Sequence, residues 1–318
     1  MIQTAAMPGV NGTIRLFQIA GIHVFLHWSW FLVAAYEIQR RERYSSLTWS
    51  ILEYLALFAI VTTHEFGHAL ACRQVGGRAD RIVLWPLGGV AYVDAPPRPG
   101  ATLWSIAAGP LVNVALIPVF LIPFLLLPAG STPPSDFRVF LGELNFINLV
   151  LLIFNILPIY PLDGGKIMRS LLWYVVGRAR SLKVTVIVGF VGVAGIGLLA
   201  LFGQSLLLAI LAIFAGMQCA GGYKQANALK RLAELPVREG AECPSCKANP
   251  PVGRIWTCGS CRNAIDSFED QAICPNCNTA FPETMCPNCG VASPYPDWLA
   301  ETSVSASAMP GPNPSGAR

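Results

Sequence analysis

Long apolar runs are the feature that most constrains what this chain can fold into. A helix needs about 20 mostly apolar residues to cross the hydrocarbon core of a bilayer. Six runs approach that length, at about 24–38, 51–72, 103–127, 137–157, 184–202 and 205–218. Only 13% of the residues are charged, about half the usual share of a soluble domain. The sequence therefore predicts an all-α polytopic membrane protein with about six transmembrane helices, and excludes a soluble enzyme, a disordered chain and a fibrous repeat.

The positive charges of the loops predict an orientation. With a cytoplasmic N-terminus, 14 Lys and Arg residues fall on the cytoplasmic side of the six predicted spans and 4 on the other side. Lys and Arg are enriched in cytoplasmic loops of membrane proteins. This bias predicts a multi-pass protein, of a bacterial cell membrane by its compact layout, with both termini in the cytoplasm. The cluster of Arg40, Arg41 and Arg43 on the outer side counts against it but is outweighed.

The segment 76–99 does not have the pattern of a helix. Two runs rich in β-branched and aromatic residues, 81–85 and 90–93, flank the turn sequence Pro-Leu-Gly-Gly at 86–89. Such a pattern is typical of a β-hairpin. At membrane depth a hairpin must lie against protein, because lipid cannot bond to its free edges. We therefore expect a membrane-associated hairpin between the second and third spans.

A His-Glu-Phe-Gly-His sequence lies inside the second apolar run. His64 and His68 are four residues apart, so both rings share one helix face and can reach one metal ion. Glu65 stands beside the first of them, where it can take a proton from metal-bound water. Ionisable residues cost roughly 2.5–3.5 kcal/mol each at the centre of a membrane helix, so three within about one turn need a reason. The alternative is a polar cluster that faces the bundle interior without a metal.

A catalytic zinc ion usually has three protein ligands and a water, so a third ligand is needed. The other two histidines, His23 and His27, lie near the first apolar run, whereas Asp163 follows the fourth. Asp163 is followed by Gly-Gly and a helical pattern, so it could equally be a helix N-cap. In the predicted topology Asp163 and the two histidines of the second run lie at the same depth. Local sequence leaves both interpretations open.

Taken together, the ordered motifs resemble the site-2 protease family of intramembrane zinc metalloproteases. The motifs are His-Glu-Phe-Gly-His at 64–68, Pro-Leu-Gly-Gly at 86–89, Ala-Gly-Pro-Leu-Val-Asn at 108–113 and Asn-Ile-Leu-Pro-Ile-Tyr-Pro-Leu-Asp-Gly-Gly at 155–165. The resemblance covers about residues 13–220 and implies three zinc ligands, His64, His68 and Asp163, with Glu65 as the general base. It also implies that Asn155 binds substrate or steadies the oxyanion, although an asparagine here could instead bridge two helices. We expect Asn113, Asn145 and Asn148 to be packing or bridging groups.

This resemblance implies a zinc metalloendopeptidase that cuts peptide bonds in or near transmembrane segments, with zinc-activated water as the nucleophile. Its substrates would be membrane proteins or membrane peptides, in regulated intramembrane proteolysis or in signal-peptide clearance. The hairpin could bind an unwound substrate by strand addition, through Trp85, Gly88, Gly89 and Val90. The alternatives are a catalytically idle membrane scaffold and a metal transporter. Neither needs a base such as Glu65 beside the ligands.

Eight of the ten cysteines form four Cys-x-x-Cys pairs after Pro236. They are Cys243 and Cys246, Cys258 and Cys261, Cys274 and Cys277, and Cys286 and Cys289. Such pairs are typical of zinc sites with four cysteine ligands, and disulfides are disfavoured in a reducing cytoplasm. The pattern resembles a double zinc ribbon with two structural zinc ions, in addition to one catalytic zinc. Sequential pairing, first with second and third with fourth, is the simplest assumption.

The cysteine pattern also divides the chain. We expect an intramembrane metalloprotease domain at 1–235, a double zinc ribbon domain at 236–292 and a disordered tail, rich in Ser, Ala, Pro and Gly, at 293–318. Residues 241–290 contain 3 basic and 5 acidic side chains, which is the wrong sign for binding phosphate backbones. We therefore expect the ribbons to bind a cytoplasmic protein partner or to present substrate, and nucleic acid to be excluded.

Overall fold

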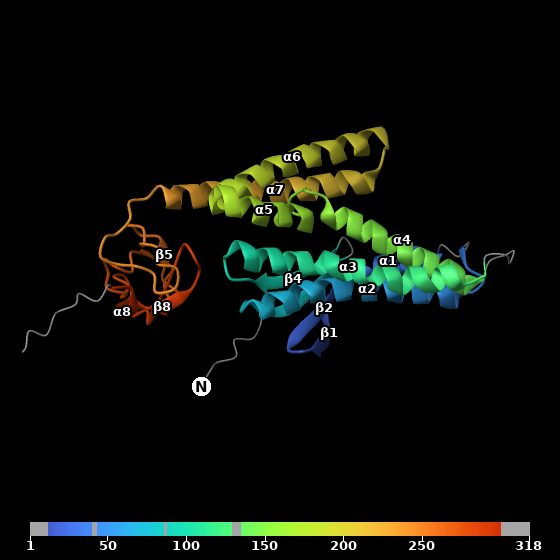
Figure 1. Ribbon diagram of the computed structural model, residues 1–318, viewed down its shortest axis with the longest axis horizontal. Helices are drawn as coiled ribbons and strands as arrows, with labels where there is room; N and C mark the ends of the chain where they lie inside the picture. The colour runs from blue at the N-terminus through green and yellow to red at the C-terminus, as the bar shows by residue number, and fades with distance from the viewer. Residues whose placement is uncertain (1–11, 40–42, 86–87, 129–134, 300–318) are drawn as a thin grey trace, which may run out of the picture. The chain divides into compact units, whose positions relative to one another are not determined.

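The computed structural model describes residues 12–39, 43–85, 88–128 and 135–299 (Figure 1). The chain divides into two compact units, Met1–Lys230 and Arg231–Arg318. The division lies a few residues before the boundary expected near Pro236. Each unit is described by itself.

A four-stranded sheet forms part of the first unit. Its strands are β1 (Thr13–Ile19), β2 (Ile22–His27), β3 (Arg78–Trp85) and β4 (Gly88–Asp94), in that order across the sheet. β1 pairs antiparallel with β2, β2 parallel with β3, and β3 antiparallel with β4. The predicted hairpin is therefore present as β3 and β4, and β1 and β2, which were not predicted, extend it to a sheet in a mostly helical unit.

The first predicted span, 24–38, is not a membrane helix. Its first part is β2, in which the buried residues Ile22, Val24 and Leu26 alternate with half-buried neighbours. Its second part is α1 (Trp30–Gln39), which has only 10 residues and so a length of about 15 Å. A strand with one buried face followed by a short helix resembles one continuous apolar run when only hydropathy is considered.

Six longer helices follow. They are α2 (Leu47–Gln74), α3 (Pro99–Leu126), α4 (Asp136–Ile156), α5 (Asp163–Val176), α6 (Arg178–Phe202) and α7 (Leu206–Ala233). Within the described residues, four of them, α2, α3, α4 and α6, are long and apolar enough to cross a membrane. These four correspond to the predicted spans 51–72, 103–127, 137–157 and 184–202. The sixth predicted span, 205–218, lies in α7, so that six spans are not shown.

Helix α2 lies at the centre of the first unit. One side packs against α3, and β3 and β4 lie along the other (Figure 1). The core between helix and sheet contains Val61, Ala69 and Cys72 of α2, together with Ile82 and Leu84 of β3. In this way α2, which carries the His-Glu-Phe-Gly-His sequence, is fixed on two sides by structure that involves no metal.

The second unit is built from very short elements. Two antiparallel hairpins, β5 (Trp256–Thr257) with β6 (Ala264–Ile265) and β7 (Glu283–Met285) with β8 (Ala292–Pro294), are followed by α8 (Tyr295–Trp298). Trp298 is fully buried, with its ring 5.4 Å from that of Phe268. β8 and α8 therefore show that the folded module continues beyond residue 292, into the start of the segment expected to be a tail. Residues 300–318 of that tail lie outside the described residues.

Candidate metal centre

His64, His68 and Asp163 come together in the interior of the first unit. Oδ2 of Asp163 lies 3.2 Å from Nε2 of His64 and 3.0 Å from Nε2 of His68, and the two nitrogens are 3.1 Å apart. All three side chains are buried, and their donor atoms lie within 4.8 Å of one another. Two imidazole nitrogens and one carboxylate oxygen form a common donor set for catalytic zinc.

Two elements far apart in sequence supply these donors. His64 and His68 lie one turn apart on α2, and Asp163 is the first residue of α5. The residue that caps α5 is Leu162, and no side chain caps the helix. The carboxylate of Asp163 therefore faces the histidines and does not cap the helix, an arrangement that is consistent with a metal ligand.

The second ring nitrogen of each histidine is held by a hydrogen bond. Nδ1 of His64 donates to Oδ1 of Asn113 at 2.5 Å, and Nδ1 of His68 donates to the carbonyl oxygen of Ser105 at 2.9 Å. Both acceptors belong to α3. With the proton on Nδ1, the lone pair of each Nε2 points toward the cluster. Partners of this kind fix the tautomer and orientation of metal-binding histidines.

Asn113 is itself held by Asn148 of α4. Its Nδ2 donates to Oδ1 of Asn148 at 2.8 Å, and Nδ2 of Asn148 donates to the backbone oxygen of Asn113 at 2.9 Å. Both side chains are fully buried. The expectation of bridging groups is thus confirmed for these two residues, but the sequence analysis missed that Asn113 orients His64. The available signal was the presence of asparagines in two neighbouring apolar runs, one in 103–127 and three in 137–157.

Gly109 of α3 allows the helix backbone to lie directly against the two histidines. A Cβ atom at this position would lie 2.3 Å from Nε2 of His68 and 2.8 Å from Nε2 of His64. No side chain fits at these distances. Gly109 lies inside the motif at 108–113, yet the sequence analysis gave it no role.

Glu65 is buried between α2 and the hairpin. Its Oε2 accepts a hydrogen bond from the backbone N–H of Ala91 in β4 at 2.8 Å. A Cβ atom on Gly89 would lie 2.3 Å from Cγ of Glu65 and 2.5 Å from Oε1. The backbone of β4 therefore rests on this carboxylate.

The remaining predicted site residues are less closely linked to the cluster. Trp85 ends β3 and stacks on His27, with ring centroids 4.0 Å apart. Gly88 and Val90 belong to β4, on either side of Gly89. Asn155 is half-buried in the last turn of α4, and its side chain makes no hydrogen bond with another described residue. The structure therefore brings Gly89 and Glu65 together, but does not join Asn155 to the metal ligands.

Comparison with known proteins shows which protein family this chain resembles. The model of peptidase family M50 matches residues 53–129 and 123–199. The match includes all three clustered residues and Glu65. Residues 53–199 are therefore similar to peptidase family M50. We call residues 53–199 the M50 segment.

Several relatives of the M50 segment are named as zinc metalloproteases. A zinc metalloprotease of Methanocaldococcus jannaschii is 32% identical over 207 residues, which cover 64% of this chain and 59% of that protein. Stage IV sporulation protein FB of Bacillus subtilis is 35% identical over 124 residues, 38% of this chain and 41% of that protein. The solved site-2 protease of M. jannaschii is 27% identical and aligns with a TM-score of 0.49, over 66% of this chain and 95% of that one. The chain thus spans only about half the length of these two curated relatives.

The eight cysteines after Pro236 form two clusters with nested pairing. Cys243 and Cys246 meet Cys286 and Cys289, and Cys258 and Cys261 meet Cys274 and Cys277. Closest sulfur distances between the pairs are 3.6–3.8 Å. These exceed a disulfide bond of about 2.05 Å, and all ten cysteines are free. The assumed sequential pairing is wrong: the first pair meets the fourth, and the second meets the third.

Nested pairing follows from how the end of the module folds back on its beginning. The N–H of Glu242 donates to the carbonyl oxygen of Trp298 at 2.8 Å, and Ala241 pairs with Leu299. This brings the last Cys-x-x-Cys pair beside the first. The pairs are separated by loops of similar length, and loop-closure entropy varies slowly with length, so spacing alone could not distinguish the two arrangements.

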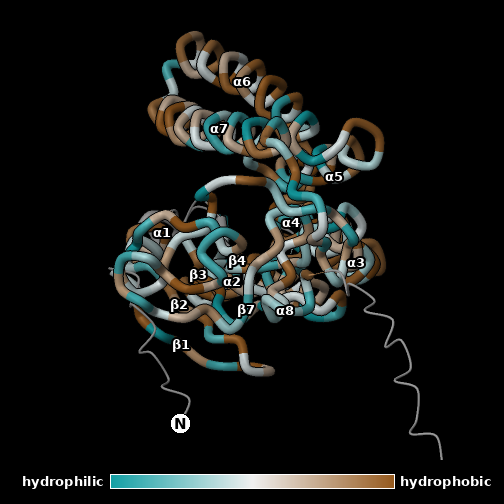
Figure 2. Tube along the Cα trace, turned by 90° about the vertical axis from the view of Figure 1, so that its left-hand side faces the viewer, coloured by the Kyte–Doolittle hydropathy of each residue, from teal (hydrophilic) through white to brown (hydrophobic). Residues whose placement is uncertain are grey.

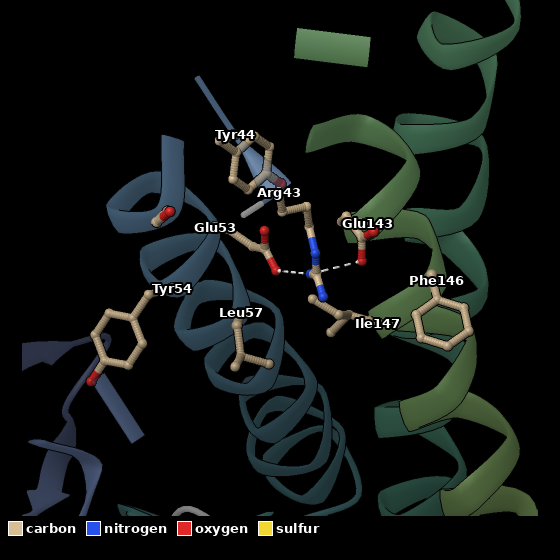
Figure 3. A pocket seen from close by; sticks show the side chains of 9 residues that line it. Arg43, Tyr44, Glu53, Tyr54, Leu57, Glu143, Phe146 and Ile147 are labelled. Atoms are coloured by element: carbon tan, nitrogen blue, oxygen red, sulfur yellow. Dashed lines mark hydrogen bonds and ion pairs between the residues drawn. The ribbon is translucent and has the colours of Figure 1, made fainter. Parts of the chain in front are cut away.

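A second polar cluster lies near the N-terminal end of α2, away from His64 and His68. Arg43 contacts Oε1 of Glu53 on α2 at 3.0 Å and Oε2 of Glu143 on α4 at 3.1 Å (Figure 3). These residues, together with Tyr54, Leu57 and Phe146, line a cavity of about 200 Å³. The guanidinium of Arg43 and the two carboxylates form an ion-pair network. It cross-links two helices rather than resembling a metal site.

Proposed function

We propose that this chain is an intramembrane zinc endopeptidase that hydrolyses peptide bonds in or near transmembrane segments of membrane proteins or membrane peptides. The observation that carries the proposal is the buried cluster of His64, His68 and Asp163 with Glu65 directly beside it. The similarity of the M50 segment to a peptidase family, and the names of several relatives, support the same activity. A catalytically idle scaffold would have no use for a second buried carboxylate next to the ligands.

In this proposal Nε2 of His64, Nε2 of His68 and the carboxylate of Asp163 hold the zinc ion. When bound, zinc lowers the pKa of water toward about 7 and polarises the scissile carbonyl. Glu65 accepts the proton of the attacking water and delivers it to the leaving nitrogen. The hydrogen bond from Ala91 fixes Oε2 of Glu65. Oε1 lies against the backbone at Gly89, which keeps the carboxylate aimed in one direction.

The hairpin offers an edge on which a substrate could unwind. β4 is the last strand of the sheet, so one of its edges has no strand partner within the described residues. The N–H of Ala91 donates to Oε2 of Glu65, so this carboxylate lies against the backbone of β4. An extended segment that adds to β4 would therefore pass beside the proposed base. Trp85, Gly88, Gly89 and Val90 would contact it, and Asn155 would bind it or steady the oxyanion from the end of α4.

The proposal extends to the cellular setting. We infer a multi-pass protein of a bacterial membrane with both termini in the cytoplasm, from the loop charges. Substrates would be cut either in regulated intramembrane proteolysis or in signal-peptide clearance. Four apolar helices in the described residues support membrane insertion.

The second unit would add two zinc ions, each with four cysteine ligands, for three per chain. Four thiolates leave no open position, so these zinc sites would be structural. Hydrogen bonding from Asn276 lowers the pKa of Cys261 to about 6, whereas burial raises the pKa of Cys274 in the same cluster to about 11. Zinc binding would therefore release a proton from Cys274. The surplus of acidic side chains favours a cytoplasmic protein partner over nucleic acid.

The change Glu65→Gln tests the activity. We expect cleavage of a panel of end-labelled transmembrane peptides by the full-length protein in bilayer nanodiscs to fall by about 10²–10⁴-fold, with three zinc ions per chain retained. The matched control is Glu143→Gln, another carboxylate of a membrane helix, which should cleave normally. His64→Ala should retain two zinc ions and no activity. Unchanged cleavage by Glu65→Gln would contradict the proposal.

A further inference from the structure

Two arginines share one tryptophan at the junction of α5 and α6. The guanidinium carbon of Arg169 lies 5.9 Å from the ring centroid of Trp173, and that of Arg178 lies 5.6 Å from the same centroid. α5 ends at Val176, and Gly177, with a φ of +80°, turns the chain into α6. Neither arginine has a role in the proposed hydrolysis.

Arg169 is a partly buried cation without an anion. Within the described part of the chain it makes no ion pair, and its Nε is buried without a hydrogen-bond partner. Burial lowers the pKa of Arg169, and the positive charge of Arg178 lowers it further. Stacking on an indole offsets part of the cost of such a charge, but two cations on one ring remain mutually repulsive. Arg169 therefore lacks a negatively charged partner.

The position of Arg169 and Arg178 in the chain indicates which anion could pair with Arg169. Arg178 is the first residue of α6, a 25-residue helix apolar enough to cross a membrane (Figure 2). The start of a membrane span lies at the level of the lipid headgroups. Lipid phosphates are therefore anions available at this junction.

Helix α5 has the composition of a helix that lies in the membrane interface. It has 14 residues, about 21 Å, too short to span. Its C-terminal half exposes Leu171, Tyr174 and Val175, the last to 83%. The basic residues of α5 are Lys166 and Arg169. Apolar side chains on one face and Lys or Arg on another are typical of helices that lie at the boundary between headgroups and acyl chains.

We propose that Arg169 and Arg178, held on the ring of Trp173, bind the phosphate of an anionic membrane lipid such as phosphatidylglycerol. The exposed apolar side chains of α5 would contact the acyl chains of the same lipid layer. α5 also begins with Asp163, so the bound lipid would hold the helix that carries a proposed metal ligand at the membrane surface. The proposal requires that α6 lies in the membrane, but it does not depend on proteolytic activity.

Native mass spectrometry of the full-length protein, released from bilayers of phosphatidylglycerol and phosphatidylcholine, tests the site. An arginine near an anionic surface contributes about 1 kcal/mol. The changes Arg169→Gln and Arg178→Gln should therefore each weaken phosphatidylglycerol binding about five-fold, without changing phosphatidylcholine binding. Arg180→Gln is the matched control, since Arg180 is exposed two residues further along α6, and should bind as the unchanged protein does.

Three results would overturn the proposal. One is normal phosphatidylglycerol binding by both variants, and another is an equal loss in Arg180→Gln, which would mean diffuse charge attraction. The third is displacement of the lipid by excess inorganic phosphate at constant ionic strength, which would identify free phosphate as the ligand. If Arg169→Gln does not fold, Arg178→Gln gives the same test from the other side of the ring. Loss of cleavage by Glu65→Gln is a separate measurement, so the two proposals can fail independently.

Discussion

The two regions proposed to bind metal relate to their surroundings in opposite ways. His64, His68 and Asp163 sit among long helices, and each histidine is held by a partner on α3. The eight cysteines of the second unit are held by strands of two or three residues. In the first region the fold positions the metal ligands. In the second, bound metal would have to stabilise the fold.

Ligand number separates the two regions further. Three protein donors leave a coordination position open for water, as in catalytic zinc sites, whereas four thiolates close a site. The second unit buries few large side chains beyond Phe268 and Trp298, so its cohesion must come mainly from metal binding. The buried core along α2 needs no such help. Metal dependence of folding is thus the property in which the regions should differ most.

Removal of zinc should show the largest effect and affect only one region. Structural zinc contributes roughly 10–16 kcal/mol to folding in zinc-finger peptides. After treatment with a strong chelator, we therefore expect backbone amides of β5 to β8 to exchange hydrogen orders of magnitude faster. Amides of α2 and α3 should stay protected. Hydrogen–deuterium exchange with mass spectrometry measures both sets of amides at once. An equal loss of protection in α2 would show that the first unit also needs metal to stay folded.

A methyl group at Gly109 should show the opposite relation in the first unit, where metal binding depends on the fold. It would disturb the packing of α3 against the two histidines and thereby prevent zinc binding. We expect Gly109→Ala to lose the zinc of the first unit, because Cβ would lie 2.3 Å from Nε2 of His68. The count should fall from three zinc ions per chain to two. Gly195→Ala is the control, since nothing lies within 4 Å of a Cβ there, and should retain three. Full zinc content in Gly109→Ala would show that α3 can move away without cost.

Asn113→Ala should give a smaller effect on the same site. Loss of a hydrogen bond to a metal-binding histidine typically weakens metal affinity about 10–100-fold. We expect that loss for the zinc of the first unit in competition with a calibrated chelator, and no change at the cysteine sites. Asn145→Ala is the control, because Oδ1 of Asn145 has no hydrogen-bond partner among the described residues. Equal affinities of the two variants would mean that Asn113 only packs.

In both regions the sequence predicted which residues cluster better than it predicted which residues contact them or pair with one another. His64, Glu65 and His68 are local in sequence, and Asp163 follows from a motif, so the cluster could be foreseen. The orienting role of Asn113 depends on the rotation of α3 against α2, which hydropathy does not contain. For the same reason the nested cysteine pairs depend on the return of Trp298 to Glu242. The first predicted span failed because a half-buried strand and a short helix together have the hydropathy of one membrane helix.

The smallest effect is expected at Arg43, where the first unit is cross-linked without metal donors. Arg43 joins Glu53 and Glu143, but 39% of its side chain is exposed, so solvent screens the pairs. Arg43→Gln should therefore lower the free energy of unfolding by only about 1 kcal/mol and leave all zinc in place. Thermal unfolding in detergent measures the change, with Arg15→Gln, an exposed arginine of β1, as control. Loss of zinc on this change would mean that the N-terminal end of α2 controls the proposed metal site. The fold of the first unit and its zinc site would then not be independent of each other.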